Sequence, residues 1–237
     1  WEQIKEYCKQ DVEVERTIRG KLLRFPPLPV EQKLWNLDQK INDLGVKVDQ
    51  ALVSNAIECD ELYQAKLLTE PVSLTGLDNP NSPDQLRRWM SETEGMDVLS
   101  MTKDYLLELK QQVESSEVKR VIELRQEMSK TSVKKYLAME RAVCKDSRIR
   151  GLLQFYGANR TGRWAGRLVQ VQNLPRNYLY DLDLARNLLI NGDYDTLELL
   201  FGSVPDVLSQ LIRTAFIPAV GSRFIVADFS AIEARVI

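Results

Sequence analysis

The sequence predicts a mainly helical α+β protein, and three observations lead to that class. Apolar residues recur at helical spacing through most of residues 30–145. Near residue 148 the composition changes to strand formers mixed with glycines and arginines. The run SRFIVADF at 222–229 is apolar almost to its acid, which is typical of a strand buried on both faces. A helical part is therefore expected to precede a part that contains strands.

Composition sets outer limits on the class of protein. A chain of 237 residues, 44% hydrophobic and 28% charged, can bury one large core or two modest ones. No apolar run approaches the length of a bilayer span, so we expect no membrane association. The first residue is Trp1 and no signal-peptide pattern follows it, so we expect a piece of a longer protein without a secretory leader.

The chain contains no histidine, which excludes a histidine general base, a Ser-His-Asp triad and His-ligated zinc. Any metal must then be held by carboxylates, which suits magnesium or manganese. The three scattered cysteines fit neither zinc spacing nor a disulfide framework. We interpret them as small buried residues of a protein in a reducing, cytoplasmic setting: Cys8, Cys59 and Cys144.

Proline and glycine delimit the first helices. Residues 1–24 are expected to be the end of a helix, which the proline-rich FPPLP at 25–29 stops. A second helix is expected from 30 to 44, with Gly45 as the residue after its C-cap. The alternating VKVD then predicts a short strand, followed by a third helix at about 50–68.

Capping residues mark the next helices. Ser82 can cap a helix that begins at Pro83, and Gln85 completes a capping box. Thr102 is expected to cap the following helix. Apolar residues at helical spacing then predict one long helix from about 116 to 143.

Strands and loops are expected from residue 148 onward, and helical pieces are expected after them, at about 181–191, 194–201 and 205–216. We place boundaries at the proline cluster and near 148–151. They divide the chain into residues 1–27, 28–150 and 151–237.

Charge is unevenly distributed although the formal net charge is only −2. Residues 117–176 contain 14 Lys and Arg against five Asp and Glu. A basic block in an otherwise acidic chain is typical of a surface that binds a polyanion. The alternative is a solvated helical face on which charges happen to cluster, and composition leaves both open.

The apolar run near the end of the sequence leads to a single acid, Asp228. A carboxylate at the carboxyl end of a buried strand stands at a sheet edge, where open sheets place their chemistry. Ser230 and Glu233 also have the spacing of a capping box, so a purely structural role for this stretch stays open.

This stretch, ADFSAIEAR, resembles motif A of the family A, or polymerase I-type, DNA polymerases, usually D-Y-S-Q-I-E-L-R. The matching residues are Asp228, Ser230, Ile232, Glu233 and Arg235. Phe229 conservatively replaces Tyr, whereas Ala231 and Ala234 depart from the motif. Upstream, TGRWAGRLVQVQNLPR at 161–176 is similar to the family's T-G-R…Q-N-I-P-R block, in a form that resembles its phage branch. LIRTAFIP at 211–218 resembles the segment that leads into motif A.

A further match lies at the start of the chain. Tyr7 and Asp11, in YCKQD, fit the Tyr-x-x-x-Asp of the family's 3′–5′ proofreading exonuclease. This spacing places both side chains on one face of a helix. A surface helix is the alternative, and the exonuclease's earlier acidic motifs are not in this sequence.

The resemblance implies an identity for each segment. Residues 1–27 would be a C-terminal remnant of the exonuclease domain, and 28–150 a helical thumb. Residues 151–237 would be the first part of a palm with an antiparallel sheet, ending in motif A. Residues 181–210 look longer than in the bacterial polymerases.

The resemblance also implies a two-metal nucleotidyl transfer. Asp228 would be one of two aspartates that hold both magnesium ions, and the backbone carbonyl of Phe229 would be another ligand. This chain would then contain half of the metal site. Glu233 would be a steric gate that occupies the space of a ribose 2′-hydroxyl and so selects deoxyribonucleotides.

Other residues would contact DNA. Arg163, Gln172 and Asn173 correspond to donors that reach minor-groove acceptors, which are present in every base pair. The stretch KTSVKKY would contact phosphates at the tip of the thumb, and a solvated face is its alternative. Its candidate residues are Lys130, Thr131, Ser132, Lys134 and Lys135.

We therefore expect a part of a DNA-directed DNA polymerase. Its expected partners are primer–template DNA and, for the full-length protein, deoxyribonucleoside triphosphates. It is expected to be monomeric and to act in the cytoplasm of a bacterium or infected host cell. Alone it is expected to bind primer–template weakly and to be inactive. The alternatives are a non-enzymatic DNA-binding clamp, a single-subunit RNA polymerase and one half of a split polymerase. An intact Asp228 and Glu233 argue against the clamp, and Glu233 against the RNA polymerase.

Overall fold

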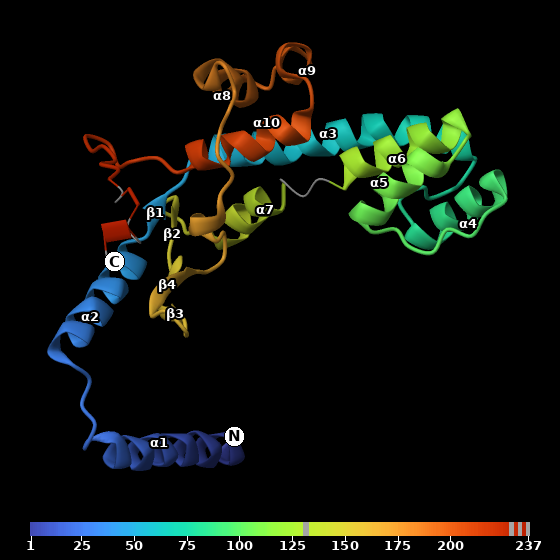
Figure 1. Ribbon diagram of the computed structural model, residues 1–237. Coiled ribbons are helices and arrows are strands. Elements are labelled where there is room, and N and C mark those ends of the chain that lie inside the picture. Colours follow the sequence, from blue (N-terminus) through green and yellow to red (C-terminus); the bar gives the residue numbers. More distant parts are fainter. Residues whose placement is uncertain (130–132, 228–229, 232–233, 236–237) are drawn as a thin grey trace. The chain divides into compact units, whose positions relative to one another are not determined.

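The computed structural model describes residues 1–129, 133–227, 230–231 and 234–235 (Figure 1). Their contacts divide the chain into two compact units. The small unit comprises Trp1–Leu44 and Leu153–Ala165, and the large unit comprises Gly45–Leu152 and Gly166–Ile237.

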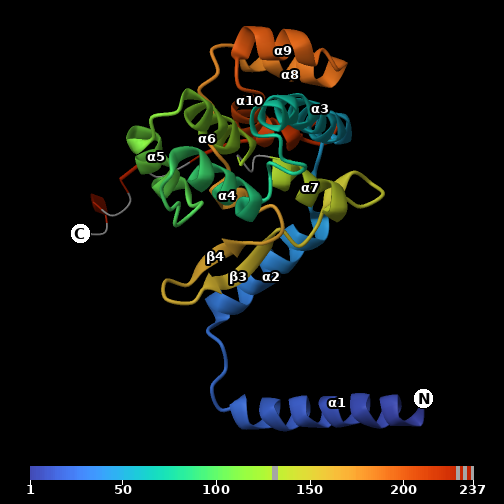
Figure 2. The same ribbon diagram turned by 90° about the vertical axis from the view of Figure 1, so that its right-hand side faces the viewer.

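The small unit contains two helices and a β-hairpin. Helix α1 (Glu2–Leu22) buries none of its residues. Helix α2 (Pro29–Leu44) packs against strand β3 (Leu153–Ala158), which pairs with β4 (Arg163–Gly166), as Figure 2 shows.

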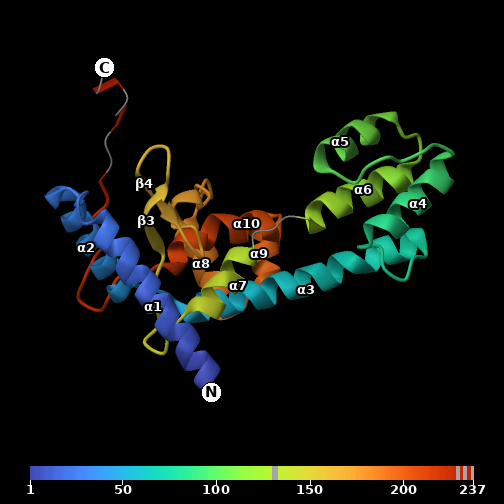
Figure 3. The ribbon, with the colours of Figure 1, turned by 90° about the horizontal axis from the view of Figure 1, so that it is seen from below.

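The large unit is built along helix α3 (Gln50–Thr75). Helices α7 (Val133–Ala142), α8 (Leu182–Asn191) and α10 (Val204–Leu211) pack on it (Figure 3). Helix α9 (Tyr194–Phe201) packs on α8, and the 3₁₀ helix η2 (Ile212–Ala215) follows α10. Their shared core includes fully buried side chains of Leu52, Tyr136, Met139, Leu189 and Leu208.

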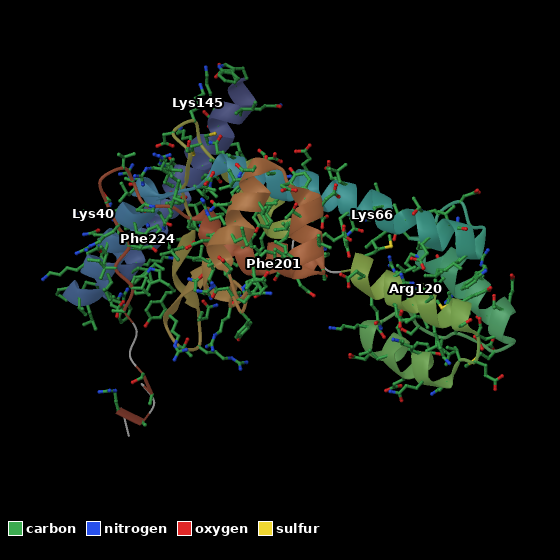
Figure 4. All side chains as sticks on the ribbon, turned by 90° about the horizontal axis from the view of Figure 1, so that it is seen from above. Lys40, Lys66, Arg120, Lys145, Phe201 and Phe224 are labelled. Atoms are coloured by element: carbon green, nitrogen blue, oxygen red, sulfur yellow. The ribbon has the colours of Figure 1, made fainter. Side chains whose placement is uncertain are left out.

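A second core forms where α4 (Pro83–Glu94), α5 (Lys103–Gln112) and α6 (Ser116–Met128) pack together. It buries Leu86, Met90, Leu109, Val118 and Ile122. Arg120 on α6 (Figure 4) donates to both carboxylate oxygens of Glu70 on α3, at 2.7 and 2.8 Å. This ion pair is exposed, so packing of the apolar faces contributes more to this contact between α3 and α6.

A short antiparallel sheet closes the start of the large unit. Strand β1 (Val46–Lys47) pairs with β2 (Arg148–Ile149), with Val46 opposite Ile149. Gly45 precedes β1 at a φ of +65°, and a Cβ there would lie 2.5 Å from the carbonyl oxygen of Ile149. Only glycine satisfies both the left-handed backbone and the close approach.

The predicted mainly helical α+β class is confirmed, with two small antiparallel sheets beside the helices. The predicted N-cap positions of two helices are also confirmed. The Ser82 hydroxyl accepts from the amide of Gln85 at the start of α4, with Pro83 in the first turn. Thr102 is the N-cap residue of α5, but its side chain accepts no capping bond from a described residue.

The predicted helix 116–143 is wrong as a single element. Helix α6 ends at Met128 and α7 begins at Val133. The hydroxyl of Ser129 donates to the carbonyl of Gln126 at 2.9 Å. Ser and Thr hydroxyls compete in this way with helical hydrogen bonds, so the sequence SKTS is a poor place to continue a helix.

The predicted buried strand at 222–229 is not found over its described part, residues 222–227. Phe224, Ile225 and Val226 are 53, 84 and 91% exposed. An apolar run is buried only where other elements cover both faces, and no strand among the described residues pairs with this one.

Two smaller expectations differ as well. Of the three cysteines only Cys59 is buried, because Cys8 and Cys144 lie on an exposed helix and an exposed turn. Helix α3 continues to Thr75, past the predicted end near residue 68 and through Pro71. The compact units also divide the chain differently from the segments 1–27, 28–150 and 151–237, which stay a prediction about domains.

Candidate nucleic-acid interface

Six of the predicted site residues lie outside the described part of the chain. They include both acids of the stretch ADFSAIEAR and the start of the KTSVKKY stretch: Asp228, Phe229, Glu233, Lys130, Thr131 and Ser132. Among the residues that the structure does describe, no group of three or more Asp, Glu, Cys or His side chains is placed to hold a metal ion. The magnesium site therefore stays a prediction.

Tyr7 and Asp11 lie one turn apart on α1, as their spacing predicts. Both are exposed, and Tyr7 is 68% accessible. Neither side chain forms a hydrogen bond or ion pair with another residue in the described ranges. The structure thus places the pair on one exposed helix face.

Arg163 is the first residue of β4, and buried side-chain hydrogen bonds hold its hairpin on α2. The carboxylate of Asp38, which is only 2% exposed, accepts from the indole Nε1 of Trp164 at 2.7 Å. It also accepts from Asn42 at 3.1 Å. The Asn42 amide in turn donates to the carbonyl of Leu153 and accepts from its N–H, both at 3.0 Å. Trp164, the residue after Arg163, is therefore held by the buried carboxylate of Asp38, both of whose oxygens accept hydrogen bonds.

The hairpin turn presents cations to solvent. Gly162 adopts a φ of +68°, and a Cβ there would lie 2.8 Å from the ring of Tyr156. The turn that glycine permits exposes Arg160 and Arg163. Neither guanidinium has an ion-pair or hydrogen-bond partner within the described ranges.

Gln172 and Asn173 lie in the large unit, on the 3₁₀ turn η1 (Val171–Asn173), and both are exposed. The Gln172 side chain covers Gly166, where a Cβ would be 2.1 Å from its Oε1. Leu168 and Gln170 both have a φ of 55°, a left-handed conformation that costs a non-glycine residue about 1–3 kcal/mol. A loop with two such residues persists only where its surroundings hold it.

Main-chain contacts and burial fix the first part of this loop, which runs from Arg167 to Pro175. The amide of Arg167 donates to the carbonyl of Leu152 at 2.8 Å, and Val169 is 1% exposed in the core of the large unit. The ammonium of Lys135 on α7 donates to the carbonyl of Val169 at 2.7 Å. Burial lowers the pKa of Lys135, in keeping with an ammonium that is drawn from solvent.

A second cation holds the end of the loop. The guanidinium of Arg213 on η2 donates from Nε to the carbonyl of Pro175 and from Nη2 to that of Leu174, both at 2.8 Å. Tyr136, next to Lys135, is fully buried and donates to the carbonyl of Leu208 on α10 at 2.7 Å. The elements that carry Lys135 and Arg213 are thereby joined to one another.

Lys134 and Lys135 thus differ, although they were predicted together as phosphate ligands. Lys134 is exposed and has no hydrogen-bond or ion-pair partner among the described residues. Lys135 is half-buried and contacts the protein's own backbone. The sequence spacing gave no signal for this difference, and Arg213 was not predicted as a site residue at all.

Charge is segregated along the chain beyond α7. Residues 147–180 contain six arginines and no acid, whereas residues 181–206 contain six acids and one arginine. That one, Arg186, forms an ion pair with Asp49. The stretch from 147 to 180 therefore carries a net positive charge, which favours a polyanion, whereas residues 181–206 carry a net negative charge.

The acidic part borders a cavity of about 300 Å³ lined by residues of α3, of α9 and the turn before it, and by Val204 of α10. There Lys66 pairs with Glu198 at 2.6 Å, and the Tyr194 hydroxyl donates to Glu58. Burial, then this hydrogen bond, raises the pKa of Tyr194 to about 12. Burial also raises the pKa of the Cys59 thiol to about 12, so that the thiol is protonated and unreactive at neutral pH.

No helix in the described ranges is both long and apolar enough to cross a bilayer. No protein-family model matches the chain. It is 62% identical, over all 237 residues, to a protein of Bacillus phage SP02 named DNA polymerase. The chain spans 36% of the length of that relative. Identity at this level over every element described above extends the similarity well beyond the short motifs.

Proposed function

We propose that this chain is part of a DNA-directed DNA polymerase. The observation that carries the proposal is the 62% identity, over the whole chain, to the phage protein named DNA polymerase. The arginine-rich, acid-free stretch from 147 to 180 supports it, because polyanion binding requires such a surface.

We further propose that the polymerase is of family A and that ADFSAIEAR is its motif A. The support is the order of three motif-like blocks at 161–176, 211–218 and 227–235. Asp228 and the carbonyl of Phe229 would supply part of the ligand set for divalent metal. Bound magnesium would neutralise charge on the attacking 3′-oxygen and on the leaving pyrophosphate. Glu233 would exclude the ribose 2′-hydroxyl by contact.

The described residues would bind and orient the primer–template. Arg163, Gln172 and Asn173 are exposed donors, as contacts to minor-groove acceptors require. Lys134 is an exposed cation suited to a phosphate. Tyr7 and Asp11 would belong to a proofreading exonuclease, whose other acidic motifs are not found in this sequence.

A segment exchange tests the proposal. The matching 36% of the phage SP02 protein is replaced by this chain, and the chimera is assayed for primer extension with magnesium. We expect extension to be retained, and Asp228→Asn to reduce it at least about a thousandfold by removing a metal ligand. Asp97→Asn, which changes an exposed acid of the same type, should leave the rate within about twofold.

The outcomes separate the levels of the proposal. A chimera that folds and binds DNA but never extends a primer would favour the alternative of a non-enzymatic DNA-binding protein. Extension that survives Asp228→Asn would remove motif A from the mechanism but leave the polymerase. Glu233→Ala should raise ribonucleotide incorporation, and an unchanged preference for deoxyribonucleotides would eliminate the gate.

A further inference from the structure

We propose that Lys135 and Arg213 form a main-chain clamp that positions Gln172 and Asn173 against the primer–template, and that Lys135 is not a phosphate ligand. The inference rests on the proposed function, because it takes Gln172 and Asn173 as DNA contacts. It adds Lys135 and Arg213 as positioning residues. It also separates Lys135 from Lys134, with which the sequence alone groups it as a phosphate ligand.

The first part of the argument is that the loop is bound at both ends by cations. Lys135 reaches the carbonyl of Val169, three residues before Gln172. Arg213 reaches the carbonyls of Leu174 and Pro175, the first two residues after Asn173. Each donor comes from a different element, α7 and η2, so neither contact follows from the loop's own sequence.

The second part is that the loop needs such support. Two non-glycine residues, Leu168 and Gln170, are held in the left-handed region, and the Gln172 side chain occupies the space that a Cβ on Gly166 would need. Relaxation of this backbone would turn the exposed face of η1. Because side chains that read a groove must lie within about 0.5 Å of their working positions, a small turn would impair Gln172 and Asn173 together.

The third part is that the two donors are themselves tied together. The hydroxyl of Tyr136, the residue after Lys135, donates to Leu208 on α10, and α10 leads directly into η2 with Arg213. Helices α7 and α10 pack on α3 (Figure 3), and η2 also contacts α3. The clamp is thus mounted on the rigid core of the large unit.

Neighbouring lysines provide the test. In the chimera, Lys135→Met is compared with Lys134→Met by three measurements: amide hydrogen exchange, the salt dependence of duplex binding, and extension from a mismatched against a matched primer end. Lys135→Met should speed exchange at the amides of Gln170 and Asn173 about tenfold, because these amides donate within the loop. It should also lower mismatch discrimination about tenfold and leave the salt slope unchanged.

Lys134→Met should do the reverse: it should reduce the salt slope by about one and leave exchange and discrimination unchanged. Lys135→Arg keeps a long cationic donor and should restore both properties. Arg213→Lys should resemble Lys135→Met, because one ammonium cannot copy two donors set at a fixed angle. It also serves as the test if Lys135→Met does not fold.

The proposal is overturned if Lys135→Met lowers the salt slope while the loop amides stay protected and discrimination is intact. Amide exchange needs no catalysis. A chimera that fails to extend any primer would therefore count against the proposed function, while exchange would still decide whether the clamp holds the loop.

Discussion

Asp60 shows how one side chain can act against the stability of its own helix. It lies on α3 with 6% of its surface exposed, and its Oδ1 has no hydrogen-bond partner among the described residues. Burial raises its pKa, a hydrogen bond from Gln64 opposes this, and the charge of Glu61 adds to it. A carboxyl whose folded pKa is raised favours the protonated form in the fold, so its ionisation at neutral pH costs stability.

The sign gives a pH-dependent prediction. Asp60→Asn removes the ionisation and should raise the free energy of unfolding by about 1 kcal/mol at pH 7. The gain should shrink as the pH falls through the raised folded pKa, and it should vanish below the unfolded pKa of about 3.9, where both states are protonated. Urea unfolding at pH 7 and pH 4 measures it, with the exposed Glu92→Gln as control. An equal gain at both pH values would show that charge burial is not the cause.

Residue-scale prediction from sequence succeeded where a motif fixes geometry and failed where a tertiary contact decides. Tyr7 and Asp11 share a helix face because a spacing of four residues requires it. Lys134 and Lys135 have the same chemistry and adjacent positions, and only the approach of Val169 distinguishes them. Asp38 carried no sequence signal either, since its partner Trp164 is 126 residues away.

At the scale of elements, local sequence chemistry predicted where a helix begins better than how far it continues. Ser82 and Pro83 begin α4 as expected, because capping is decided within one turn. The break between α6 and α7 and the length of α3 beyond residue 68 depend on a balance between propensity and packing. The run 222–227 has strand composition without strand structure, because pairing requires neighbours that composition does not supply.

The role of Gly45 beside the sheet of β1 and β2 can be tested by substitution. Gly45 and Gly76 have nearly the same φ, +65° and +66°, but only Gly45 faces backbone within 4 Å. Gly76→Ala should cost about 1–2 kcal/mol through the left-handed backbone alone. Gly45→Ala should cost at least about 1 kcal/mol more, because its Cβ would meet the carbonyl of Ile149 beside β1 and β2. Equal losses in urea unfolding would mean that the sheet yields to accommodate the methyl group.

At the scale of the whole molecule, the basic block found in the sequence is smaller in effect than its composition indicates. Arg120 and Arg150 are neutralised within the protein by Glu70 and Asp146, with distances as short as 2.7 and 2.6 Å. Lys135 is committed to a carbonyl. By contrast, Arg160, Arg163 and Arg176 have no ion-pair or hydrogen-bond partner in the described ranges. Counting residues in the sequence could not separate the cations that have partners in the fold from those that have none among the described residues.

If the proposed function holds, this distinction predicts how DNA binding depends on salt. Each phosphate contact contributes about 0.9 to the slope of log affinity against log salt, because it releases condensed counterions. Exchange of the available pair, Arg160→Gln with Arg176→Gln, should therefore reduce the slope by about two and weaken binding to duplexes of any sequence. The matched exchange of the committed pair, Arg120→Gln with Arg150→Gln, removes the same formal charge. It should change the slope by less than about half as much, since those guanidinium groups already have carboxylate partners.

Fluorescence titrations of a labelled primer–template at several salt concentrations measure both slopes. If the two double variants lose the same slope, the partners seen in the fold do not govern which cations meet DNA, and net charge alone would explain the binding.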